Sequence, residues 1–349
     1  MTVDAQSVSL DGATRASRVY GFASLNALVL LVGAVAALLS VAIAPGLDRP
    51  VAAWAVSGIG LAALLRCGPR AWPGLFLANL PLHAVLEQSW PAAFIIAAAA
   101  TLGPVLAAWL FRRWAFDRAL GTPADVVRFA VLACPQALAV PLIGIGTLTS
   151  IGALQWSELS DLWLEWAFAN CIGVLAITPL LLFWHDSRFE AARRTEFLLS
   201  GALLLGVTAL CYSLTPPIGY PVLLVLMLIA VRQSQREVAI AMLAVIAVAL
   251  GESMHRDWLP FAGAAPSNTR VLGFLAFASA GSLLLGALVT ESRRKDAQLL
   301  QAQQDRLKQS ETQFEGAFEA SAQGMAITSL EGRWLRVNAA LGRMLGYSI

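Results

Sequence analysis

Long apolar runs are the feature that most restricts what this chain can fold into. Ten of them occupy most of the first 290 or so residues, and several reach about 20 residues, the length that crosses the hydrocarbon core of a bilayer. Inside lipid each backbone N–H and C=O needs a partner within the protein, which favours helices. The runs cover residues 21–44, 51–65, 72–86, 92–111, 129–150, 162–184, 197–214, 218–231, 238–250 and 271–289.

Charge is scarce as well. Charged residues make up 13% of the chain, against roughly 25% in soluble domains. We therefore predict an all-α, multi-pass membrane helix bundle with the lipid bilayer as its surroundings. The formal net charge is only +2, and no nucleic-acid partner is expected.

The basic residues predict the orientation of the bundle. With the N-terminus placed inside, sixteen Arg and Lys residues near segment ends fall on the inner side and three on the outer side. Cytoplasmic loops carry an excess of Arg and Lys in membrane proteins. We expect a cytoplasmic tail over residues 1–20, a membrane domain over 21–290 and both termini in the cytoplasm.

Four of the apolar runs are too short to fix the number of spans. Segments 2, 3, 8 and 9 have only about 13–15 apolar residues, a length that also suits re-entrant hairpins. Each short pair turns at an arginine-bearing loop, 66–70 or 232–236. Removing either pair leaves both termini inside, so the prediction is eight to ten transmembrane helices.

A polar connector follows the last apolar run. Residues 291–313 contain good helix formers and neither Gly nor Pro, which predicts a cytoplasmic linker helix. Leu300, Leu307 and Phe314 repeat every seven residues, the spacing of a coiled-coil seam. We predict that these three residues relay a signal in a homodimer; a single amphipathic helix lying on a neighbouring domain is the alternative.

Polar side chains within the apolar runs are the candidate functional residues. Such groups are costly in lipid and usually serve a purpose there. Asn79, His83 and Glu87 are spaced four residues apart, which places them on one stripe of a helix. Glu165 and Asn170 lie in a later segment, and Gln136 is a similar case. We predict that Asn79, His83, Glu87, Glu165 and Asn170 form a polar core that senses a stimulus.

Signatures of catalysis, metal binding and cofactor binding are missing from the sequence. The four cysteines, Cys67, Cys134, Cys171 and Cys211, form no CxxC pair and lie in or beside apolar runs. No phosphate-binding loop, nucleophile elbow or metalloprotease helix occurs. We predict no catalytic residue, no metal and no cofactor, although an enzymatic domain could follow in a longer gene product.

A pattern within the apolar region resembles a known family. It runs from Trp54 and Gly58 through Trp72-Pro-Gly to Ala78-Asn79, and it continues with Trp166-x3-Asn170-x2-Gly173-x5-Pro179 and with residues 221–236. This pattern is similar to the first type of membrane-associated sensor domain, the MASE family. The resemblance implies a bacterial inner-membrane input module, usually joined to PAS, histidine kinase or cyclic-di-GMP turnover domains.

The last 36 residues, 314–349, resemble the start of a PAS domain. Residues 325–329 and 333–337 are predicted strands around the turn Leu330-Glu331-Gly332. Asn338 then begins a helix that Gly346 ends. A PAS fold needs about 100 residues, so we expect an incomplete α+β fragment.

Together these features predict the sensory input module of a bacterial signalling protein. A stimulus, small-molecule or physical, would act on the membrane domain, and the linker helix would pass the change to PAS and an output domain. A membrane transporter with a polar site at broken helices is the alternative, since short segment pairs occur in both halves of the chain.

Overall fold

A computed structural model describes residues 21–43, 54–87, 89–114, 120–155, 157, 159–183, 191–213, 220–255 and 268–346. The predicted tail, residues 1–20, lies outside the described residues. The chain divides into two compact units, Met1–Glu291 and Ser292–Ile349.

Helices make up the first unit, and each of the ten predicted apolar runs overlaps a helical segment. The first five helices are α2 (Phe22–Ile43), α3 (Trp54–Cys67), α4 (Trp72–Glu87), α5 (Trp90–Arg113) and α6 (Pro123–Ser150). They are followed by α7 (Leu159–Ile172), α8 (Thr178–Phe183), α9 (Ala191–Ser213), α10 (Tyr220–Arg232), α11 (Gln235–His255) and the first part of α12 (Asn268–Ala320).

Five of the described helical stretches are long and apolar enough to cross a bilayer. They are Phe22–Ala42, Trp90–Arg113, Pro123–Ser150, Leu159–Phe183 and Thr269–Ala320. This confirms a helical, membrane-type fold. Because α3 and α10 have only 14 and 13 residues, the count of eight to ten spans stays a prediction.

Side-chain caps explain where two of the long helices begin. Ser89 accepts a hydrogen bond from the backbone N–H of Ala92 at the start of α5, and Thr122 accepts one from Asp125 at the start of α6. In both helices a proline follows within the first turn, where its missing N–H costs no hydrogen bond.

Prolines lie inside several of these helices without ending them. Helices α4, α5 and α6 continue through Pro81, Pro104, Pro135 and Pro141. The irregular stretch is a π-helical turn, Gly173–Ile177, which separates α7 from α8 just before Pro179. Proline has no N–H to donate to the preceding turn, which favours a local rearrangement there.

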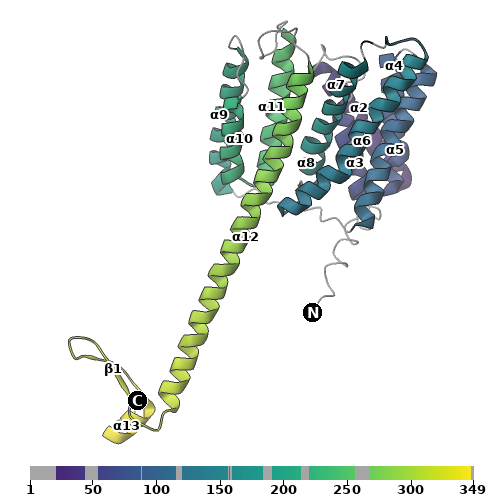
Figure 1. Ribbon diagram of the computed structural model, residues 1–349. Helices are drawn as coiled ribbons and strands as arrows, with labels where there is room; N and C mark the ends of the chain where they lie inside the picture. The colour runs from purple at the N-terminus through teal and green to yellow at the C-terminus, as the bar shows by residue number, and fades with distance from the viewer. Residues whose placement is uncertain are drawn as a thin grey trace. The chain divides into compact units, whose positions relative to one another are not determined.

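Helix α3 lies in the middle of its neighbours. It packs against α2, α5, α7, the π-helical turn and α8, and it has few contacts with α4, which instead packs on α2 and α5. Helices α9, α10 and α11 form a separate group, and α11 contacts α8 (Figure 1). Helix α3 is therefore surrounded by helices in this part of the bundle.

The second unit contains the rest of α12, a two-stranded antiparallel sheet and a short helix. Strand β1 (Ala326–Thr328) pairs with β2 (Trp334–Val337), and α13 (Ala339–Leu345) follows. Asn338 caps α13, and Gly346 ends it with a φ of 79°. The predicted hairpin and helix are confirmed. These two elements alone do not establish a PAS fold.

Asn338 joins the parts of this second unit. Its side chain is fully buried; its amide N–H groups donate to the carbonyls of Phe318 and Gln323, and its oxygen accepts from the N–H groups of Met325 and Leu341. These four bonds have lengths of 2.8–3.0 Å. The end of α12 is thus attached to the hairpin and to α13.

Candidate functional site

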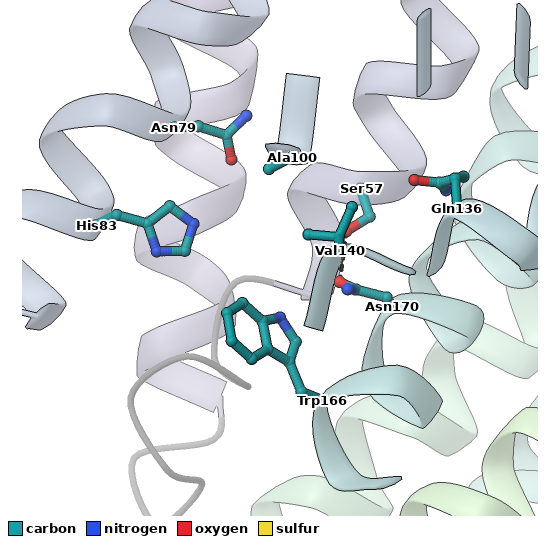
Figure 2. A pocket seen from close by; sticks show the side chains of 8 residues that line it. All are labelled: Ser57, Asn79, His83, Ala100, Gln136, Val140, Trp166 and Asn170. Carbon is teal, nitrogen blue, oxygen red and sulfur yellow. Dashed lines mark hydrogen bonds between the residues drawn. The ribbon is translucent and has the colours of Figure 1, made fainter. Parts of the chain in front are cut away.

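A small polar cavity lies within the first unit, between α3, α4, α5, α6 and α7. Figure 2 shows the side chains that surround it, several of which carry polar groups within an otherwise apolar bundle. The lining residues are Ser57, Asn79, Ala100, His83, Gln136, Val140, Trp166 and Asn170.

Helix α4 supplies Asn79 and His83. Their four-residue spacing places both on the same face of the helix, as predicted, and both are almost fully buried. The amide of Asn79 donates to the carbonyl oxygen of Leu75, at 2.9 Å. Glu87 lies one turn further and does not line the cavity, although its buried carboxylate is 3.8 Å from Nδ1 of His83.

Helix α7 supplies Trp166 and Asn170, again four residues apart. The Oδ1 atom of Asn170 accepts a hydrogen bond of 2.6 Å from the hydroxyl of Ser57 on α3, drawn dashed in Figure 2. The Trp166 ring is buried, and its centroid is 6.4 Å from that of His83. Asn170 precedes the π-helical turn by three residues, so the irregular backbone begins next to the cavity.

The Trp166 ring fits where α6 has no side chain. A Cβ atom placed on Gly144 would lie 2.1 Å from the nearest ring carbon, far inside van der Waals contact. Gly144 therefore allows the indole to pack directly on the backbone of α6, which fixes one wall of the cavity.

Gln136 of α6 completes the polar lining. Gln136 is 8% exposed, and its Nε2 atom has no hydrogen-bond partner among the described residues. The same is true of Nδ1 of His83. Buried polar groups nearly always have a partner. The nearest acceptor to Nδ1 of His83 is Oε1 of Glu87, 3.8 Å away, which also has no hydrogen-bond partner among the described residues.

Glu165 is the candidate that the structure places elsewhere. It is buried, but it does not line the cavity; its Oε1 atom accepts a hydrogen bond of 3.3 Å from the hydroxyl of Thr269 on α12. One turn further along α7, Phe168 contacts α12 at Gly273, where an added Cβ would lie 3.4 Å from its ring. The five-residue step from Glu165 to Asn170 turns the helix by about 140°, to a different face.

The structure brings together three of the five predicted polar residues: Asn79, His83 and Asn170. It adds Ser57, Trp166, Ala100 and Val140, which sequence reasoning did not choose. Serine, alanine and valine are ordinary in apolar helices, and none carried a signal. Trp166 could have been found from its four-residue spacing to Asn170.

The chemistry of the cavity is that of neutral hydrogen bonding. Its polar groups are amides, a hydroxyl, an imidazole and an indole. Among the side chains that the structure describes, no group of three or more His, Cys, Asp or Glu residues is placed to hold a metal ion.

Comparison with known proteins identifies the fold family. The model of the MASE1 family matches residues 24–293, more than three quarters of the chain. The chain belongs to the MASE1 family. MASE1 is a membrane sensor domain, and its limits include the whole polar cavity as well as the part of α12 that contacts α7.

One curated relative gives the MASE1 domain a signalling context. The protein named "Probable diguanylate cyclase DgcE" from Escherichia coli (strain K12) is 27% identical over 325 residues, a match that covers 84% of this chain and 26% of that protein. The chain thus spans about a quarter of the length of this relative. No solved structure matches it.

Proposed function

We propose that this MASE1 domain is the sensory input of a bacterial inner-membrane signalling protein with both termini in the cytoplasm. A stimulus acts at the polar cavity and shifts the bundle between two arrangements. Helix α7 passes the shift to α12, and α12 carries it as a linker helix to a PAS domain and an output domain. The output is cyclic-di-GMP turnover or a histidine kinase.

The observation that carries this proposal is the double role of α7. One of its faces presents Trp166 and Asn170 to the cavity, and another contacts α12 through Glu165 and Phe168. A rotation or shift of α7 that follows binding therefore changes the contacts of α12 directly. The π-helical turn after Asn170 supplies a place where the helix can repack.

The properties of α12 support its role as the relay. It is continuous from Asn268 to Ala320, and no proline interrupts it. Leu300, Leu307 and Phe314 are each more than half exposed, so their seven-residue stripe is available to a second copy of the chain. A homodimer through this stripe is part of the proposal.

The relative supports the choice of output. Its name describes a diguanylate cyclase, an enzyme that makes cyclic-di-GMP, and this chain matches about a quarter of it. We propose by analogy that the MASE1 domain here regulates cyclic-di-GMP synthesis in a longer protein. This step rests on similarity and not on any catalytic group of the chain itself.

A chimera tests the function. Residues 1–349 replace the matching region of DgcE, and cellular cyclic-di-GMP is measured by mass spectrometry. His83→Ala and Asn170→Ala are expected to change the level about fivefold or more, the scale of an ordinary coupling energy, without loss of membrane insertion. Val85→Ala, in the same helix as His83 but 76% exposed, is the matched control.

Two results would overturn this function. If both cavity variants produce the same cyclic-di-GMP level as the wild-type chimera, the cavity is not the input. If vesicles that contain the chain accumulate a small polar solute and Asn170→Ala abolishes that uptake, the protein is a transporter. Normal insertion of each variant is checked by membrane fractionation.

A further inference from the structure

Two cysteines of the membrane domain lie against each other, although they belong to different helices. Cys134 is in α6 and Cys171 is in α7, and these helices pack side by side (Figure 1). Neither cysteine is in a disulfide, and their thiol groups are in hydrogen-bonding contact with each other. The axes of packed helices are about 8–10 Å apart, which places facing Cα atoms within the roughly 4–7 Å that a disulfide spans. A bond between the two sulfur atoms therefore needs only a small adjustment.

A second contact shows that the two cysteines lie on facing sides of these helices. The indole N–H of Trp163 in α7 donates to the carbonyl of Leu138 in α6, at 3.2 Å. Leu138 is about one turn from Cys134, and Trp163 is about two turns from Cys171, so each pair shares a face of its helix. The contact between the thiols is therefore part of the interface between α6 and α7.

The depth of the pair limits which reagents can reach it. At about 1.5 Å per residue, Cys134 lies about 17 Å along α6 from Pro123, and Cys171 lies about 18 Å along α7 from Leu159. The hydrocarbon core of a bilayer is about 30 Å thick, so both sulfur atoms lie well inside it. A charged or strongly polar oxidant would have to leave water to reach them, which is costly. The co-reactant of these thiols therefore has to dissolve in lipid.

One of the two thiols is accessible from the lipid. Cys171 is only 8% exposed, whereas Cys134 is partly exposed. Cys134 shares a stripe of α6 with Val131 and Leu138, whose apolar side chains are 60% and 40% exposed. In a bilayer such a stripe contacts the acyl chains. A molecule dissolved in the membrane thus meets Cys134 first, and Cys171 lies behind it as the second thiol.

We propose that Cys134 and Cys171 form a redox-active dithiol that a lipid-soluble quinone oxidises to a disulfide. The bond between the two Sγ atoms forms, and both S–H bonds break. Two electrons and two protons pass to the two carbonyl oxygens of the quinone, which becomes a hydroquinone. Quinones fit this place because they are uncharged, dissolve in lipid and take up the two electrons and two protons that a dithiol releases.

The disulfide connects two walls of the polar cavity. Gln136 follows Cys134 by two residues and Asn170 directly precedes Cys171, and both line the cavity. The consequence of oxidation, though not the oxidation itself, rests on the sensory function proposed above. A bond between α6 and α7 restrains α7, whose other face contacts α12, and so favours one of the two arrangements of the bundle. The redox state of the membrane quinones is then the stimulus.

The reaction is tested with the chain, residues 1–349, in lipid nanodiscs. Cys67→Ala and Cys211→Ala leave only the proposed pair of thiols. The reduced protein is mixed without oxygen with a short-chain ubiquinone, whose ring has no free position for thiol addition, and is alkylated before and after reduction of disulfides. Mass spectrometry is expected to find Cys134 joined to Cys171 in most chains, with one hydroquinone formed for each disulfide. Glutathione disulfide, which is charged and stays in water, is expected to leave both thiols reduced.

Two variants test the place. Cys171→Ala combined with Ala169→Cys keeps two thiols but turns the second by about 200° around α7, away from Cys134, and is expected to form no disulfide. Cys134→Ala leaves one thiol and is expected to produce no hydroquinone. Circular dichroism identifies a variant that fails to fold, and the other variant then decides.

The proposal is overturned if the quinone leaves both thiols reduced, if glutathione disulfide oxidises them as fast, or if the pair with Ala169→Cys reacts as the native pair does. The DgcE chimera tests the consequence separately. Oxidation of the membrane quinones is expected to change cyclic-di-GMP about fivefold, and Cys134→Ala to abolish that change. A disulfide without any change in cyclic-di-GMP removes this consequence and leaves the dithiol. Absence of the disulfide with intact effects of His83→Ala and Asn170→Ala removes the dithiol and leaves the sensory function.

Discussion

Gly58 of α3 and Gly173 of the π-helical turn bring two backbones into direct contact. A Cβ atom on Gly58 would lie 2.0 Å from the carbonyl oxygen of Gly173, and one on Gly173 would lie 1.9 Å from that of Trp54. The hydroxyl of Thr178 donates to the carbonyl of Gly58, at 2.8 Å. Small residues commonly permit such close approach between helices in membranes.

This contact predicts that even the methyl side chain of alanine is too large at position 58. Gly58→Ala forces α3 away from the turn beside the cavity, and overpacking of this kind costs about 1–3 kcal/mol or more. We expect a lower unfolding midpoint in nanodiscs. Gly146→Ala is the matched control, because Gly146 lies in α6 with nothing within 4 Å of an added Cβ. That control is expected to be neutral or stabilising, by up to about 1 kcal/mol. Equal effects of the two changes would contradict the close packing.

The contact between α7 and α12 predicts a second effect. Thr269→Val keeps the shape of the side chain and removes the hydrogen bond to Glu165, worth about 1 kcal/mol. In the DgcE chimera this variant is expected to weaken the response to His83→Ala. Ser279→Ala, also in α12, loses only a bond to Leu275 of the same helix and is the control. An unchanged response in Thr269→Val would exclude this contact from the relay.

The sequence predicts the apolar helices because the length of an apolar run is a local property. A helix cap such as Asn338 is also local and can be predicted in the same way. The neighbours of a helix are not local. The four-residue spacing of Asn79 and His83 predicts that both lie on one face of a helix. Nothing in the sequence indicates that Ser57 of α3 contacts Asn170 of α7, 113 residues away. Glu165 was grouped with Asn170 because both are polar, and the rotation of the helix separates them.

The orientation of the short helices is a third prediction. In a background without the four native cysteines, Arg70→Cys lies in the exposed turn between α3 and α4 and Trp90→Cys at the exposed start of α5. If α3 and α4 both cross the membrane, an impermeant maleimide labels Cys at position 90 in intact spheroplasts. It labels Cys at position 70 only after permeabilisation. Labelling of position 70 from outside would instead support a re-entrant hairpin.

The stripe on α12 predicts where two copies meet. Cysteines at Leu300, Leu307 and Phe314 are expected to form disulfide-linked dimers when membranes are treated with a mild oxidant. Asp305 and Thr312, exposed on the opposite side of the helix, are the control positions. Efficient cross-linking at the stripe positions and at the control positions alike would indicate random collision. Absence of cross-linking at the stripe positions would contradict the proposed dimer.

Asn338 and Arg336 predict a contrast within the second unit. Asn338 is fully buried and makes four hydrogen bonds, two of which go to the carbonyls of Phe318 and Gln323. Asn338→Ala leaves those carbonyls without their partner, and each such loss costs about 1–3 kcal/mol. Arg336 binds Glu315 at 2.9 Å, but both side chains are substantially exposed, and such pairs contribute at most about 1 kcal/mol.

Hydrogen exchange of the amides of β1 and β2 in the full chain measures the difference. Asn338→Ala is expected to accelerate exchange in both strands by about tenfold or more, because the hairpin loses its attachment to the end of α12. Arg336→Ala is expected to change it by less than about fivefold. If the two variants exchange alike, Asn338 does not hold this unit together, and α12 has no firm connection through which to move it.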